Sequence, residues 1–339
     1  MSIAIKKHWN SAESWSAANP YIRPVVALVA VAVLAAMPFV ISKFGLVVLS
    51  SALILGLFAV GLNIAVGFSG MISLGHAAFF GVGAYSSALL FAHIGVAAPI
   101  GLLGALIVGG GFGALFALIA QHVRGGYLVM LTIALAQVFA SLSETLREIT
   151  GGSDGLAVPF PSVLPGWGEL NNLVSKYWFI LAAVVICVTG LWLVVRSPLG
   201  RSFLALKQNE ARLESLGYSV LRVKVAVWAI SGAAAAYAGS LSAINNELVS
   251  TSDFGFMNSA LPLLVLGIAG TRSMFTPFIG AIVIVLVRDQ LAPYFLGRQI
   301  LLLGALFVIS AFLFPNGVSW KEVKGLGSRI GKLGRTGRR

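Results

Sequence analysis

Long apolar runs, separated by short segments rich in Gly, Pro or charged residues, dominate the pattern of this chain. A run of about 20 apolar residues predicts a transmembrane helix, because that length crosses the hydrocarbon core of a bilayer. We identify ten runs, several of them shorter than a full crossing: residues 25–41, 46–66, 77–91, 100–120, 128–142, 178–195, 225–243, 259–269, 277–287 and 300–314. The pattern predicts an all-α, polytopic integral membrane protein with about ten transmembrane spans.

Two stretches between these runs, residues 67–77 and 267–277, contain backbone breakers rather than a polar loop. Non-helical backbone at membrane depth is tolerated only where protein or a water-filled cavity covers it. We therefore expect broken or re-entrant segments there. Five spans precede the loop 143–177 and five follow it, so the two halves would be inverted relative to each other. The breaks occupy similar places in these halves, which points to a site between them.

The composition agrees with a membrane protein. Hydrophobic residues make up 58% of the chain and charged residues only 10%, whereas a soluble domain carries roughly 25% charged residues. This balance excludes a soluble enzyme, a disordered chain and a collagen.

The charges predict an orientation. If the chain starts in the cytosol, 18 of the 23 Lys and Arg residues fall inside and seven of the 11 Asp and Glu residues fall outside. Cytoplasmic loops carry such an excess of cations, so we expect both termini in the cytoplasm. The net charge of +12 then needs no nucleic acid as partner. The expected regions are a cytoplasmic leader (1–24), a transmembrane domain (25–314) with an external loop (about 143–177) and a cytoplasmic loop (about 196–224), and a basic cytoplasmic tail (315–339).

The sequence contains no pattern that supports catalysis or a metal site. It lacks the H-E-x-x-H, G-x-S-x-G and Walker A motifs, its four histidines are scattered, and Cys187 is its single cysteine. The spans hold no Asp, Glu, Lys or Arg away from their ends, which disfavours a proton-driven transporter. We expect no enzyme, no catalytic residue and no metal ligand. A pore, or a permease powered by other proteins, remains.

Residues 67–90 are the most informative segment, with five glycines within seventeen residues. Glycine lets backbones approach closely and lets a helix break. The candidates for lining a translocation pathway are Ser69, Ser73, Gly75, His76 and Tyr85. A packing face of small residues without ligand contact explains the segment equally well, and an isolated histidine such as His76 is more often a buried structural residue.

The internal loop 196–224 contains Leu204, Leu206, Leu213 and Leu216 at nearly helical spacing among charged residues. This pattern predicts a short amphipathic helix outside the membrane, ended by Gly217.

Several motifs resemble one known family. G-L-N-I-A-V-G-F-S-G-M-I-S-L-G-H-A-A-F-F-G-V-G-A-Y, starting at Gly61, resembles the hallmark stretch of the permease subunits of branched-chain amino acid ABC importers, the LivM/LivH family. Further matches follow in order: R-G-G-Y at 124–127 with Thr132, T-G-G-S-D-G-L at 150–156, S-P-L-G-R at 197–201, and N-E-A at 209–211 followed by L-G at 216–217. The chain length and the R-G-G-Y run are most similar to the LivM type.

The resemblance implies partners and roles. A second permease subunit (LivH-like), two cytosolic ATP-binding subunits (LivG/LivF-like) and a periplasmic or external substrate-binding protein would work with this chain in the bacterial plasma (inner) membrane. The chain would hold no cofactor, because ATP is used by the partner subunits. Glu210, Ala211 and Gly217 match the loop that couples an importer to its ATPase. The cargo would be branched-chain or related amino acids. A same-family permease for urea or short amides, and a passive channel for small neutral solutes, are alternatives.

Overall fold

The computed structural model describes residues 31–123, 125–163, 170–271, 273–291 and 304, and the chain divides into the units Met1–Leu46 and Val47–Arg339. In the first unit, residues 31–36 are helical and precede the short helix η1 (Met37–Phe39) and the first turn of α3 (Lys43–Asn63). The expected leader (1–24), last span (300–314, apart from residue 304) and tail (315–339) lie outside the described residues.

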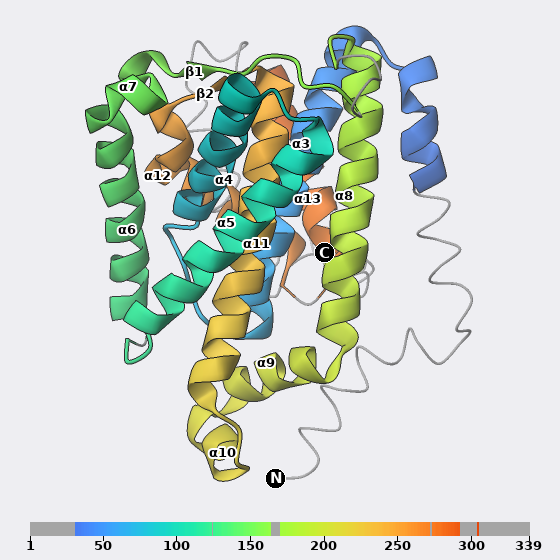
Figure 1. Cartoon of the computed structure of the whole chain (residues 1–339). Coiled ribbons are helices and arrows are strands. Elements are labelled where there is room, and N and C mark those ends of the chain that lie inside the picture. Colours follow the sequence, from blue (N-terminus) through green and yellow to red (C-terminus); the bar gives the residue numbers. More distant parts are fainter. Residues whose placement is uncertain (1–30, 124, 164–169, 272, 292–303, 305–339) are drawn as a thin grey trace, which may run out of the picture. The chain divides into compact units, whose positions relative to one another are not determined.

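The second unit continues α3, and its described residues are almost entirely helical (Figure 1). Its further elements are η2 (Ile64–Phe68), α4 (Ala77–Leu89), η3 (Leu90–Ile94), α5 (Ala98–Ile119), α6 (Gly126–Thr145), α7 (Arg147–Thr150), η4 (Gly152–Asp154), β1 (Leu156–Ala157), α8 (Leu173–Arg196), α9 (Pro198–Gln208), α10 (Glu210–Ser215), α11 (Val220–Asn246), β2 (Leu248–Val249), η5 (Thr251–Phe254), α12 (Phe256–Ala269), α13 (Thr276–Leu286) and η6 (Val287–Leu291).

Six helical stretches in the described part of the chain are long and apolar enough to cross a membrane. They are Lys43–Phe68, Ala77–Ile94, Ala98–Ile119, Gly126–Thr145, Leu173–Arg196 and Val220–Asn246. A shorter apolar helix covers Phe256–Ala269. The all-α membrane fold is confirmed, whereas a total of ten spans is not.

Helix α11 forms the centre of the second unit, where it packs mainly against α5 and α4. Small residues permit the close approach. A Cβ atom on Gly83 of α4 would collide with the main chain of Ala236, and one on Gly113 of α5 would collide with the carbonyl of Trp228. Membrane helices, which gain little from burying apolar surface, commonly associate through such contacts.

The two long loops lie at opposite ends of the second unit (Figure 1). At one end, β1 pairs antiparallel with β2 through Leu156↔Val249 and Ala157↔Leu248. At the other end lie α9 and α10. Helix α11 runs from one end to the other.

The prediction of a single amphipathic helix in residues 204–216 is wrong. Asn209 adopts an extended conformation (φ −165°, ψ 112°) and divides the segment into α9 and α10. Its side-chain oxygen accepts a hydrogen bond from the main-chain N–H of Arg212 (3.1 Å), so it caps a new helix. Leu206 and Leu213 are buried as expected, but Leu216 is 68% exposed.

Candidate functional site

The chain leaves the helical conformation after α3, as the breakers in residues 67–77 predict. The π-helical turn η2 follows Asn63, and the next regular helix, α4, begins only at Ala77. The Ser69 hydroxyl donates to the carbonyl of Ala65 (2.6 Å) and satisfies one group at the end of the turn. Gly70 has a positive φ of 76°, which lets the chain turn away from the helix axis. We refer to residues 69–76 as the first break.

His76 lies at the end of the first break and is completely buried. Its Nε2 is 2.8 Å from the Ser231 hydroxyl, which itself donates to the carbonyl of Gly61 (2.7 Å). Because that hydroxyl has only one hydrogen, it accepts from His76, and Nε2 carries the ring proton. The Ser73 hydroxyl then donates to Nδ1 (3.2 Å). One neutral imidazole thus connects the first break to α11 and α3.

Aromatic rings surround the imidazole. The ring centroids of Phe58, Phe79 and Trp228 lie 6.3, 5.0 and 5.9 Å from that of His76. This apolar shell and the two hydroxyl partners give the residue the environment of a structural histidine in the conformation described.

Two further helices hold the first break. The main-chain N–H of Leu74 donates to the Thr132 hydroxyl on α6 (3.2 Å), and that of Ala77 donates to the Ser259 hydroxyl on α12 (3.0 Å). A Cβ atom on Gly75 would collide with the main-chain carbonyl of Thr132. The glycine is therefore required by the close approach of α6.

The expected second break is also present. Helix α12 ends at Ala269, Gly270 has a φ of 79°, and α13 begins at Thr276. The amide of Asn63, at the end of α3, donates from Nδ2 to the carbonyl of Ser273 (3.0 Å). The second break is therefore held against the end of α3, directly before the turn η2 that leads into the first break.

A lysine of the loop 196–224 contacts the turn η2, which leads into the first break. Lys207, on α9, donates from Nζ to the carbonyl of Gly67 in η2 (2.6 Å). A Cβ atom on Gly70 would lie 3.1 Å from Cγ of the same lysine. Helix α9 is thus in direct contact with the start of the first break.

The residues predicted for coupling lie on and after α10. Glu210 forms an ion pair with Lys224 on α11 (2.8 Å) and its side chain is 22% exposed. Lys224 also donates to the carbonyl of Gln121 (2.9 Å). Ala211 and Gly217 are exposed, and Gly217 has a φ of 84°. Glu210 therefore fixes α10 to α11, while Ala211 and Gly217 remain on the surface.

The predicted pathway residues fall into two groups. Ser69, Ser73, Gly75 and His76 come together in the first break, and all four are buried. Tyr85 lies elsewhere on α4, stacked on Phe254 of η5 with ring centroids 5.5 Å apart and planes 9° apart. It belongs to the packing near β1 and β2.

Five residues that hold the first break, or the turn that leads into it, were not predicted from the sequence. They are Asn63, Thr132, Lys207, Ser231 and Ser259. Asn63 and Thr132 stood within quoted motifs, but no role was predicted for them. The other three carried no local signal.

Comparisons with known proteins identify a family. The family described as "Branched-chain amino acid transport system / permease component" matches residues 45–311, which include both breaks and the helices α9 and α10. The high-affinity branched-chain amino acid transport system permease protein LivM of Salmonella typhimurium is 31% identical over 316 residues, covering 87% of this chain and 74% of the relative. LivM of Escherichia coli is also 31% identical, covering 86% and 74%. The ribose import permease protein RbsC of Haemophilus influenzae is 26% identical, covering 66% and 69%.

Proposed function

Because the chain belongs to the family of permease components of branched-chain amino acid transport systems, we propose that it is the membrane permease subunit of an ABC importer and forms a translocation pathway for branched-chain amino acids. The match over residues 45–311 is the observation that carries this proposal. The names of the LivM relatives supply the substrate class. They do not favour a permease for urea or short amides, or a passive channel.

The proposal includes partners. A LivH-like second permease, two LivG/LivF-like ATP-binding subunits and an external binding protein complete the importer in the bacterial inner membrane. The ATP-binding subunits consume the ATP, and this chain carries no cofactor. Both termini face the cytoplasm, as the distribution of Lys and Arg favours, and the loop 143–177 faces the binding protein.

We assign α9 and α10 to coupling with the ATP-binding subunits. A short helix that projects from a membrane domain can dock in a groove of a partner and transmit a rigid-body displacement. In this hairpin, formed by α9 and α10, Ala211, Leu216 and Tyr218 are exposed beside the exposed charged residues Arg212 and Glu214, so a partner could contact both apolar and charged groups. The positive φ of Gly217 lets the chain turn back toward α11. The Glu210–Lys224 ion pair connects α10 to α11, so a displacement of α10 would also displace α11.

The first break is the element that switches. Lys207 connects it to α9, and Ser231 connects His76 to α11, so a displacement of the hairpin reaches residues 69–76 by two routes. Alternating access commonly uses broken helices near the middle of the membrane. Ser69, Ser73, Gly75 and His76 would border the pathway in another state of the cycle, while Tyr85 keeps the neighbouring helix in place.

Reconstitution tests this function. The chain, its LivH-like partner and the two ATP-binding subunits are placed in proteoliposomes with the binding protein, and uptake of radiolabelled leucine is measured with and without ATP. We expect ATP-dependent uptake by the full set and none by the chain alone. Passage of leucine through vesicles that contain only this chain would contradict the proposal.

A further inference from the structure

A cavity of about 250 Å³ includes in its lining Asn245 and Asn246, at the end of α11 that is remote from α9 and α10. It is smaller than the roughly 300–1,000 Å³ of sites for drug-sized ligands, so it suits a small solute. The lining residues come from α3, α4, α11, η5, α12 and η6: Ser51, Ile54, Leu55, Phe58, Phe80, Ser242, Asn245, Asn246, Asp253, Asn258, Leu261 and Arg288.

One part of this cavity is apolar. Ile54, Leu55, Phe58, Phe80 and Leu261 are all buried. The rings of Phe58 and Phe80 are 4.7 Å apart between centroids, and Phe58 also stacks on His76. The cavity therefore ends on the aromatic shell of the first break. An aliphatic side chain would gain from leaving water here, whereas a sugar or urea would lose hydrogen bonds.

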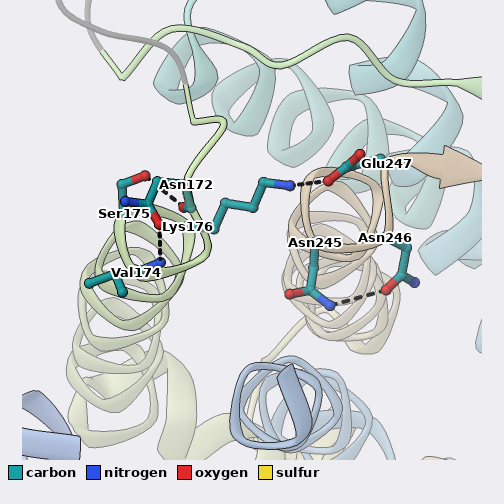
Figure 2. Close-up of polar contacts among 7 residues, drawn as sticks. All are labelled: Asn172, Val174, Ser175, Lys176, Asn245, Asn246 and Glu247. Atoms are coloured by element: carbon teal, nitrogen blue, oxygen red, sulfur yellow. Dashed lines mark hydrogen bonds and ion pairs between the residues drawn. The ribbon is translucent and has the colours of Figure 1, made fainter. Parts of the chain in front are cut away.

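The other part is polar and more exposed. Near the end of α11, Asn245 donates to Asn246 (3.0 Å), and Asn246 donates to the Ser242 hydroxyl (3.2 Å). Figure 2 shows that both amides point away from the ion pair between Lys176 and Glu247 on the other side of the helix. That ion pair holds the end of α11 against α8, and this fixes the position of the helix end that bears Asn245 and Asn246.

Two opposite charges complete the polar part. Asp253, on η5, accepts a hydrogen bond at Oδ2 from the main-chain N–H of Ser250 (3.0 Å). Burial raises the pKa of its carboxyl, which means that its charged form would gain from a cation nearby. Arg288, on η6, pairs with Asp289 through Nε and Nη2. A guanidinium has five N–H donors, so this pair leaves others for a second carboxylate.

We propose that this cavity binds the zwitterion of an aliphatic amino acid, with Asp253 facing its ammonium group, Arg288 facing its carboxylate and the five apolar residues enclosing its side chain. The proposal rests on the proposed function, because it takes the cargo to be a branched-chain amino acid. It adds a site in the permease itself, on the side that would receive cargo from the binding protein. An uncharged amide lacks both ionic groups, and ribose lacks an aliphatic side chain. The cavity therefore selects against both compounds.

Binding of radiolabelled leucine to the full chain in nanodiscs tests the site. The competitors are isoleucine, ribose, leucinamide, which lacks the carboxylate, and 4-methylpentanoate, which lacks the ammonium group. We expect isoleucine to compete and ribose to fail, and each truncated analogue to bind at least about tenfold more weakly than leucine, as the loss of a charge-assisted hydrogen bond predicts. Arg288→Gln should abolish the difference between leucine and leucinamide, and Asp253→Asn should abolish the difference between leucine and 4-methylpentanoate.

Exposed residues of α7 provide matched controls. Arg147→Gln and Glu148→Gln remove the same charges outside the cavity and should leave leucine binding unchanged. Absence of saturable leucine binding by the folded chain would overturn the proposal, as would Arg288 and Asp253 variants that bind every analogue like the wild type. Leucine uptake by the full importer without binding by this chain would reject the cavity and keep the proposed function. Leucine binding by this chain without amino acid uptake by the full importer would keep the cavity and reject the proposed function.

Discussion

Lys207 donates a hydrogen bond from Nζ to the carbonyl of Gly67 over 2.6 Å, although 140 positions separate the two residues. The carbonyls at the end of a helical turn carry partial negative charge, so a cation is favourable there. The contact joins a helix outside the membrane-spanning set to η2, the last turn of the helical stretch Lys43–Phe68. A movement of α9 would therefore act on η2, the turn that leads into the first break.

Removing this contact is expected to uncouple transport from ATP hydrolysis. Lys207→Met keeps the aliphatic stem beside Gly70 but loses the hydrogen bond. We expect leucine uptake per ATP hydrolysed to fall at least about fivefold in the reconstituted importer, with membrane insertion intact, because a charge-assisted hydrogen bond is lost. Arg201→Gln, an exposed cation on the same helix, is the control and should keep the wild-type ratio. An unchanged ratio for Lys207→Met would show that α9 does not act through Gly67.

The ion pair between Glu210 and Lys224 predicts rescue by charge exchange. Glu210→Lys places two cations together and should lower uptake severalfold, because α10 loses its link to α11. The double variant Glu210→Lys/Lys224→Glu restores opposite charges and should recover most of the uptake. A double variant that transports no better than Glu210→Lys would mean that Glu210 acts mainly on the partner subunit.

Ser231 should contribute more to stability than another buried serine of the same helix. Ser231→Ala removes the acceptor of His76 and the donor to Gly61, so we expect a loss of about 1–2 kcal/mol in unfolding free energy. Ser240 is equally buried, and its hydroxyl finds no partner among the described residues. Ser240→Ala should therefore be neutral or stabilising. Thermal unfolding in detergent, followed by size-exclusion chromatography, compares the two variants, and equal midpoints would contradict the assigned network.

Gly75 should not tolerate a methyl group. Gly75→Ala drives a Cβ atom into the carbonyl of Thr132, and moving α6 away is expected to cost about 1–3 kcal/mol. The control is Gly111→Ala on α5, where a Cβ atom meets nothing within 4 Å. The same thermal assay measures both. A Gly75→Ala protein as stable as Gly111→Ala would show that the first break is not packed against α6 as described.

Sequence patterns predicted the features that depend on local chemistry. Apolar runs located the long helices to within a few residues, and glycine-rich stretches located both breaks, because helix formation and its interruption are decided by nearby residues. The division between α9 and α10 was missed although Asn209 is a preferred helix cap. The partners Lys207 and Ser231 could not be foreseen, because only the folded packing brings them to Gly67 and His76. The roles of Glu210, Ala211 and Gly217, and of the pathway candidates, stay predictions.

The glycine contacts between α4, α5 and α11 limit how these helices can move. The carbonyl groups of Ala236 and Trp228 on α11 lie where a Cβ atom would stand on Gly83 and Gly113. Sliding α4 or α5 along α11 by a fraction of a turn would therefore bring these carbonyl groups against side chains. The three helices should therefore travel as one block during the transport cycle. Spin labels on the exposed ends of α5 and α11 would keep a constant separation in pulsed electron paramagnetic resonance, even while the importer turns over.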